Sequence, residues 1–149
     1  MAQTDKKLHH LTIHEAGNLL KSGDLSPVEL TQAFFNRIAE TDDRLHSVIT
    51  LLQDNAMGEA RAAEAEIRSG RYRGPMHGIP IALKDLYDTA GIRTTAGSRV
   101  DFDRVPTTDS TPTARLKKAG SILLGKLAMH EFALGGPDWT TPFEPARNP

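Results

Sequence analysis

A lysine at the end of an apolar segment is the side chain of this sequence best placed to do chemistry. The segment runs Gly78-Ile-Pro-Ile-Ala-Leu-Lys84-Asp85, a short apolar stretch that ends in two opposite charges. Ligands of open α/β sheets bind in the crevice beyond the strand ends. A lysine partly withdrawn from water there gives up its proton more easily and can act as a base. A solvated lysine that merely caps a strand is also common, so position alone leaves both interpretations open.

A second lysine lies in a stretch that resembles a phosphate-binding loop. Gly120-Ser-Ile-Leu-Leu-Gly125-Lys126 follows most of that pattern, but Leu127 stands where a Ser or Thr must hold magnesium. The interior of the stretch is an apolar strand rather than a loop that could surround a phosphate. We therefore predict no nucleotide site, and we expect Lys126 to matter far less to catalysis than Lys84.

Two histidine–glutamate pairs each begin a zinc-binding helix motif. His14-Glu15 and His130-Glu131 lack the second histidine, because Asn18 and Leu134 occupy its position. Zinc needs three or four ligands of defined geometry, so surface histidines are the better interpretation. The sequence predicts no metal site.

Composition excludes several other classes of function. The 149 residues carry a net charge of −1 with a pI near 6.6, which predicts no nucleic-acid or anionic-membrane partner. The absence of cysteine excludes disulfides, thiolate metal sites and a cysteine nucleophile. No apolar run approaches the roughly 18 residues of a spanning helix, and residues 1–15 contain no apolar signal core. We expect a cytoplasmic protein.

The lysine must be positioned by flanking helices and strands. Capping-box patterns at Thr12 and Ser26 predict two helices, the first ending near Gly23, and a third helix is expected from about Asp54 to Ser69. The expected buried face of the first helix is Ile13, Ala16, Leu19 and Leu20. That of the second helix is Leu30, Phe34 and Ile38, and that of the third is Ala56, Ala60, Ala63 and Ile67.

Short apolar runs predict the strands. These are Ser47–Leu52, Ile79–Leu83 and Ser121–Leu124, and the last two have the continuous apolar character of strands buried on both faces. A short helix should open at Thr111-Pro112, and residues 135–149 should form a long loop. The pattern predicts an α/β protein.

Motifs along nearly the whole chain, in order, resemble the amidase-signature family. The segment Gly74–Gly91 is similar to the family's lysine-bearing strand and turn. The other similar segments are Leu25–Leu30, Thr94–Ser98, Ala119–Lys126, Met129–Gly135 and Ala146–Pro149. The resemblance implies that residues 1–149 are the N-terminal part of a single amidase-signature domain. It implies an incomplete mixed sheet with helices on both faces.

The resemblance also implies a mechanism. Family members cleave amide bonds with a Ser–cis-Ser–Lys triad and no cofactor, and Lys84 matches the triad lysine. Both serines lie in a Gly/Ser-rich segment that follows the family's Arg-Asn-Pro, where this chain ends. Ser98, Ser110 and Ser121 are not in such a segment. We therefore expect the isolated chain to be inactive.

The substrate side of the site is less defined. Ala133, Leu134 and Gly135 match a family region near the acyl channel, although a packed turn is an equally good interpretation. Leu127 and Ala128 depart from the Thr-Asn of many members, and the run Gly135–Trp139 favours an amidase of small-molecule amides.

Two alternatives to that amidase stay open. One is a transamidase like the A-subunit of glutamyl-tRNA amidotransferase, and the other is a truncated, non-catalytic binding or assembly module. The expected partners are a small-molecule amide substrate and either a second copy of the chain or the remainder of the amidase chain.

Overall fold

A computed structural model describes residues 7–136 and 141–149 of the chain. Its centre is one mixed sheet with the strand order β1-β3-β2. Strand β2 (Pro80–Lys84) runs parallel to β3 (Ile122–Leu127), and β1 (Val48–Leu51) runs antiparallel to it. The segments expected as strands therefore do form strands, and the sheet is mixed as the resemblance implied.

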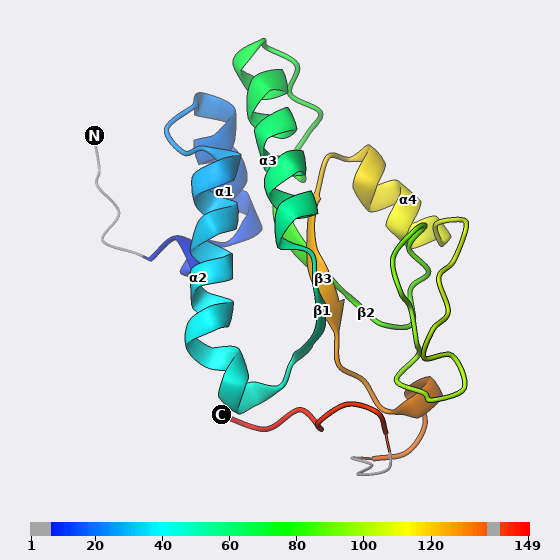
Figure 1. Ribbon diagram of the computed structural model, residues 1–149. Helices are drawn as coiled ribbons and strands as arrows, with labels where there is room; N and C mark the ends of the chain where they lie inside the picture. The colour runs from blue at the N-terminus through cyan, green and yellow to red at the C-terminus, as the bar shows by residue number, and fades with distance from the viewer. Residues whose placement is uncertain (1–6, 137–140) are drawn as a thin grey trace.

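Four α-helices surround this sheet in the described residues: α1 (Ile13–Ser22), α2 (Pro27–Leu45), α3 (Gln53–Arg68) and α4 (Thr111–Lys118). Figure 1 shows α1, α2 and α3 together on one side of the strands, with α4 and the loop before it on the other. Two short 3₁₀ turns, Leu8–His10 and Glu131–Ala133, complete the regular structure. The α/β class with helices on both faces of the sheet is confirmed.

The first two α-helices begin where their capping residues predict. The Thr12 hydroxyl accepts the Glu15 N–H and the Glu15 carboxylate accepts the Thr12 N–H, and Ser26 and Glu29 form the second box. The first helix ends at Gly23, which adopts the left-handed conformation with φ of 80°. The Ser26 hydroxyl also donates to the Glu64 carboxylate at 2.6 Å, which ties the start of α2 to α3.

The core contains two apolar clusters on the face of the sheet that α1, α2 and α3 cover. One joins α1 and α2 to the residue before β2 through Ala16, Leu20, Leu25, Leu30 and Ile79, and the other joins α2 and α3 to β3 through Phe35, Ala56, Ala60, Ile122 and Leu124. Alanines on α3 let this helix lie close against β3, as its sequence predicts. Each fully buried leucine contributes roughly 1.5–3 kcal/mol to the free energy of unfolding.

Two details of the expected burial are wrong. Ile13, assigned to the buried face of the first helix, is 52% exposed because it lies in the first turn, beyond the reach of the core. Only β3 is buried along most of its length, whereas β2 is half-buried for most of its own. The difference arises because β3 is the central strand of the described sheet and β2 is at its edge.

No helix of the described residues is both long enough and apolar enough to cross a membrane.

Strand β1 passes very close to β3 at Gly125. A Cβ atom at this position would lie 2.3 Å from the carbonyl oxygen of Thr50, which is backbone and cannot move aside. Gly125→Ala should therefore lower the free energy of unfolding by at least about 2 kcal/mol. Gly58→Ala, on an exposed face of α3 with nothing within 4 Å, should instead be neutral or stabilise by up to about 1 kcal/mol. Equal denaturation midpoints for the two variants would contradict this packing.

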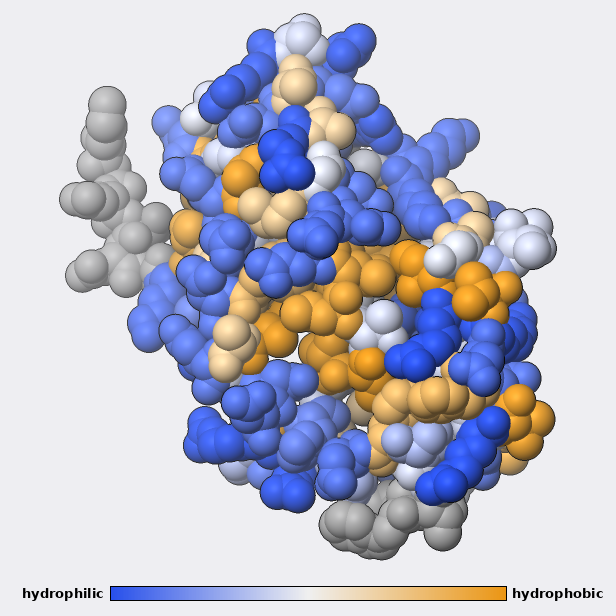
Figure 2. Space-filling model, in the orientation of Figure 1, coloured by the Kyte–Doolittle hydropathy of each residue, from blue (hydrophilic) through white to orange (hydrophobic). Residues whose placement is uncertain are grey.

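Apolar side chains and strand edges are open to solvent. Val100 is 83% exposed, Leu51 46% and Leu86 46%, and Figure 2 shows a continuous apolar band across the middle of one face. Within the described residues, β1 and β2 each pair on one side only. Open edges and apolar patches promote association. We predict that residues 1–149 expressed alone self-associate, as measured by light scattering; a monodisperse monomer with a sharp melting transition would contradict this.

Candidate active site

Lys84 lies at the mouth of a cleft beyond the end of β2. The cleft has a volume of about 290 Å³, and Lys84 is exposed there. The remaining lining residues come from β1, from the segment after β3 and from the C-terminal segment: Ile49, Ala128, Met129, His130, Ala133, Thr141, Phe143, Glu144, Pro145 and Ala146. No hydrogen bond or ion pair joins the Lys84 side chain to another residue in the described part of the chain. Lys84 therefore lies where the sequence predicts it, at the end of a strand and beside a cleft.

The direction of Lys84 follows from strand alternation. Leu83 is 7% exposed and Asp85 0%, while Lys84 between them is exposed. Successive side chains of a strand point to opposite faces, so burial of both neighbours turns Lys84 outward. The Lys84 carbonyl also accepts the Tyr87 N–H at 3.0 Å, which starts the turn after the strand.

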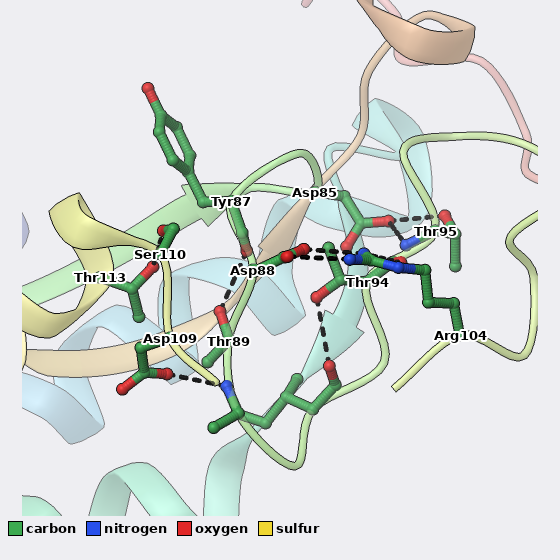
Figure 3. Close-up of polar contacts among 12 residues, drawn as sticks. Asp85, Tyr87, Asp88, Thr89, Thr94, Thr95, Arg104, Asp109, Ser110 and Thr113 are labelled. Atoms are coloured by element: carbon green, nitrogen blue, oxygen red, sulfur yellow. Dashed lines mark hydrogen bonds and ion pairs between the residues drawn. The ribbon is translucent and has the colours of Figure 1, made fainter. Parts of the chain in front are cut away.

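Asp85 is fully buried directly behind Lys84. One carboxylate oxygen accepts both the Thr95 N–H at 2.8 Å and the Thr95 hydroxyl at 2.6 Å (Figure 3). The other oxygen lies 3.2 Å from the ammonium of Lys126. A single side chain therefore joins the end of β2 to the loop that follows it and to β3.

Lys126 is also fully buried. Its ammonium donates to the Tyr87 carbonyl at 2.9 Å and to the Thr94 hydroxyl at 2.7 Å, besides the contact with Asp85. Burial lowers the pKa of Lys126 below its ordinary value, and the Asp85 carboxylate opposes that shift. The lysine of the apparent phosphate loop is in fact half of a buried ion pair.

Further ionic contacts hold the loop between β2 and α4. Arg104 donates two hydrogen bonds to the Asp88 carboxylate, at 2.7 and 2.8 Å, and these bonds lower the pKa of Asp88 (Figure 3). Asp109 accepts the Ala90 N–H at 2.7 Å and pairs with Lys117, and the Lys117 contact lowers the pKa of Asp109. The loop is thereby fixed at several points of its length.

Unusual backbone conformations occur where this loop meets the segment after β3. Ala96, Phe132 and Ala133 have φ angles of 53°, 48° and 62°, a region that non-glycine residues rarely occupy. Phe132 donates its N–H to the Ala96 carbonyl at 2.8 Å, and the Ser98 hydroxyl donates to the Glu131 carboxylate at 2.6 Å. Strained residues of this kind persist where surrounding bonds determine them, and they are concentrated at functional sites.

The residues expected to line the substrate side are only partly brought to the cleft. Ala133 lines it together with Lys84. Leu134, which is 76% exposed, and Gly135 are not among its lining residues. The run Gly135–Trp139 lies partly outside the described residues.

The histidine half-motifs lie apart from one another. His14 contacts the Asn18 amide on α1 at 3.1 Å, whereas His130 is at the cleft. In residues 7–136 and 141–149, no three His, Cys, Asp or Glu side chains form a group that could hold a metal ion.

The site residues that sequence reasoning missed are Asp85 and Lys126. A charged residue inside an apolar strand, as at Gly125-Lys126-Leu127, is a signal that an opposite charge is buried nearby. Two such charges on adjacent predicted strands could have suggested the pair.

Comparison with known proteins identifies one family. A family model described as Amidase matches residues 29–149. The chain is 43% identical over 143 residues to the A-subunit of glutamyl-tRNA(Gln) amidotransferase from Moorella thermoacetica, covering 96% of this chain and 29% of that protein. The same protein of Geobacter metallireducens is also 43% identical, with the same coverage.

Solved structures give the same result. The peptide amidase of Stenotrophomonas maltophilia is 37% identical, with a TM-score of 0.75 over 88% of this chain and 26% of that one. Another crystal structure, described as an amidase, is 34% identical, with a TM-score of 0.82 over 93% of this chain and 31% of that one. The chain therefore spans less than a third of the length of these relatives.

Gly97 is where the loop after β2 contacts the segment after β3. Its φ is 69°, and a Cβ there would lie 2.9 Å from the Met129 carbonyl oxygen. Gly91 has a similar φ of 74° with nothing within 4 Å, so it is a matched control for backbone strain. Both alanine variants should lose about 1–2 kcal/mol of unfolding free energy in chemical denaturation, since both adopt the left-handed region. Gly97→Ala should lose at least about 1 kcal/mol beyond that strain, because its Cβ would also collide with the backbone of Met129, which lines the cleft; equal losses would contradict this.

Proposed function

Because the chain belongs to the amidase family, we propose that it is the N-terminal, lysine-bearing part of an amide hydrolase. The observation that carries the proposal is Lys84, which stands at the end of β2 in a cleft. The segment Gly74–Gly91 around it resembles the family's lysine-bearing strand and turn. The relatives that support this proposal are about three times longer than this chain, so the activity belongs to the complete enzyme.

The proposed reaction is hydrolysis of a small-molecule amide by a Ser–cis-Ser–Lys triad. A serine attacks the amide carbonyl, and its proton passes through the bridging serine to the neutral amine of Lys84. The proton then returns to the leaving amine, and water releases the acyl group from the enzyme. Of these groups only Lys84 is in this chain, and the reaction uses no cofactor.

The cleft supports the substrate side of the proposal. Ala133 contributes to the same cavity as Lys84. Leu134 and Gly135, exposed beside it, remain proposed contacts for the acyl group once the rest of the domain is in place. The exposed apolar residues and open strand edges are a suitable surface for that remainder, which is the proposed partner of residues 1–149. The cytoplasmic location and the inactivity of the isolated chain stay predictions.

A second candidate function is transamidation. The relatives from Moorella thermoacetica and Geobacter metallireducens are named as glutamyl-tRNA(Gln) amidotransferase subunits, and their identity exceeds that of the peptide amidase. The complete protein should be assayed with simple amides and, together with the other amidotransferase subunits, with glutamine and glutamyl-tRNA(Gln). Turnover of simple amides without formation of Gln-tRNA supports the hydrolase; formation of Gln-tRNA supports the transamidase.

The role of Lys84 predicts the behaviour of two substitutions in the complete enzyme. Lys84→Ala should reduce kcat by at least about a hundredfold, since a positioned base contributes 10²–10⁴-fold. Lys84→Arg should be nearly as defective, because a guanidinium stays charged and accepts no proton. Both melting temperatures should stay within a few degrees of the parent, because the Lys84 side chain is exposed.

The matched control is Lys118→Ala, which removes an exposed lysine at the end of α4, away from the cleft lining. It should leave kcat unchanged. Near-full hydrolysis by Lys84→Arg would show that Lys84 is not the base and would remove the basis of the proposed function.

A further inference from the structure

We propose that the buried Asp85–Lys126 ion pair is a positioning device for Lys84, so that catalysis depends on the pair through the geometry of the strand end. This inference rests on the proposed function of Lys84 as the base. It assigns to Asp85 and Lys126 a role beyond stability, although neither side chain reaches the cleft.

The sheet places the two lysines on opposite faces of adjacent strands. Lys126 on β3 is paired in register with Leu83 on β2, and Lys84 is paired with Leu127. Neighbours in register share a face, so Lys126 lies on the buried side with Leu83 and Asp85. Lys84 is on the other side, at the cleft. The ion pair is therefore directly behind the backbone that carries the proposed base.

Asp85 uses all of its polar groups to fix that backbone. Its N–H donates to the Leu127 carbonyl at 3.2 Å, and its carbonyl accepts the Ala96 N–H at 3.0 Å. One side-chain oxygen accepts from Thr95 twice, and the other contacts Lys126. With β3 on one side and the loop on the other, the residue next to Lys84 cannot shift without breaking several of these bonds.

Lys126 completes the arrangement from the other strand. The three N–H groups of an ammonium match the three oxygens around it, those of Tyr87, Thr94 and Asp85. Tyr87 and Thr94 both belong to the loop between β2 and α4, with Tyr87 near its start and Thr94 seven residues further along. A single cation therefore holds two points of the loop close to the end of β2.

Stability alone is a weak reason for such a pair. Two charges removed from water lose hydration free energy that their attraction in the interior only partly returns, and apolar replacements of similar volume are often as stable. What charges add is a defined geometry, because each bond is directional and a mismatched partner is costly. At this place in the fold, the geometry so defined is that of the Lys84 backbone.

The test separates geometry from stability in the complete enzyme. Lys126→Met removes the cation, keeps the length of the side chain and leaves the Asp85 carboxylate buried without a counter-ion. Asp85→Asn/Lys126→Met removes both charges together, so it should regain most of the melting temperature lost by Lys126→Met. We expect its kcat nevertheless to stay at least about tenfold below the parent, since a misplacement near 1 Å can cost as much as ~100-fold. Its KM should stay within about threefold, because neither residue lines the cleft.

A double variant with parental kcat and recovered stability would overturn the proposal and leave the pair a structural element only. Lys84→Ala measured alongside keeps the two failures distinct. If Lys84→Ala retains activity, the proposed function itself is wrong; if it is inactive while the double variant is fully active, only the positioning role is wrong.

A milder pair of variants covers the case in which the charge variants do not fold. Thr95→Val removes the hydroxyl bond to Asp85, together with the bond that the hydroxyl accepts from the Gly97 N–H, and keeps the ion pair. Thr89→Val removes an equally buried hydroxyl that donates to the Tyr87 carbonyl instead. Thr95→Val should lower kcat by about three- to tenfold at unchanged KM, since one fixing bond of Asp85 is lost. Thr89→Val should have a smaller effect. Equal kcat values for Thr95→Val and the parent would overturn the proposal.

Discussion

The parallel pairing of β2 with β3, continued past the strand ends by the Asp85–Lys126 contact, is the constraint on which the rest of this structure depends. The ladder runs from Pro80 opposite Ile122 to Lys84 opposite Leu127. Where it ends, the main-chain bond from Asp85 to Leu127 and the 3.2 Å ion pair behind it hold the two strands together for one more step. Because the Tyr87 carbonyl and the Thr94 hydroxyl accept hydrogen bonds from the buried ammonium, the loop that leaves β2 is folded around it rather than extended into solvent.

The same two strand ends deliver part of the cleft lining, which Ile49 of β1 and the C-terminal segment complete. Strand β2 delivers Lys84 and continues into the loop that reaches Ala96 and Ser98, while β3 continues into Met129 and the strained residues Phe132 and Ala133. The two continuations meet where Phe132 donates to Ala96 and Ser98 donates to Glu131. The cleft itself lies beyond the same strand ends, where open α/β sheets bind ligands, and it is lined by residues from distant parts of the sequence.

Much of the fold followed from local sequence because its signals are local. The capping boxes at Thr12 and Ser26, the glycine that ends α1 and the alanine face of α3 each act within one helix, and each is observed. The short apolar runs also mark the strands, but a run does not say which strand is central, so β2 is less buried than its sequence predicts.

The burial of Lys126 could not be predicted from its sequence neighbours alone for a related reason. Its burial depends on Asp85, which is 41 residues away in the sequence (126 − 85) and adjacent only through the sheet. The site lysine itself was predicted from a family resemblance, since a lysine at a strand end is ambiguous on physical grounds alone.

The central claim is that Lys84 is the base that activates a serine nucleophile supplied by the rest of the amidase domain. The most direct measurement is the rate at which a fluorophosphonate, which reacts with activated serines, labels the complete enzyme and its Lys84→Arg variant over a range of pH. The account predicts that Lys84→Arg reacts at least about a hundredfold more slowly than the parent at neutral pH. Labelling of Lys84→Arg at the parental rate, with the same dependence on pH, would contradict it.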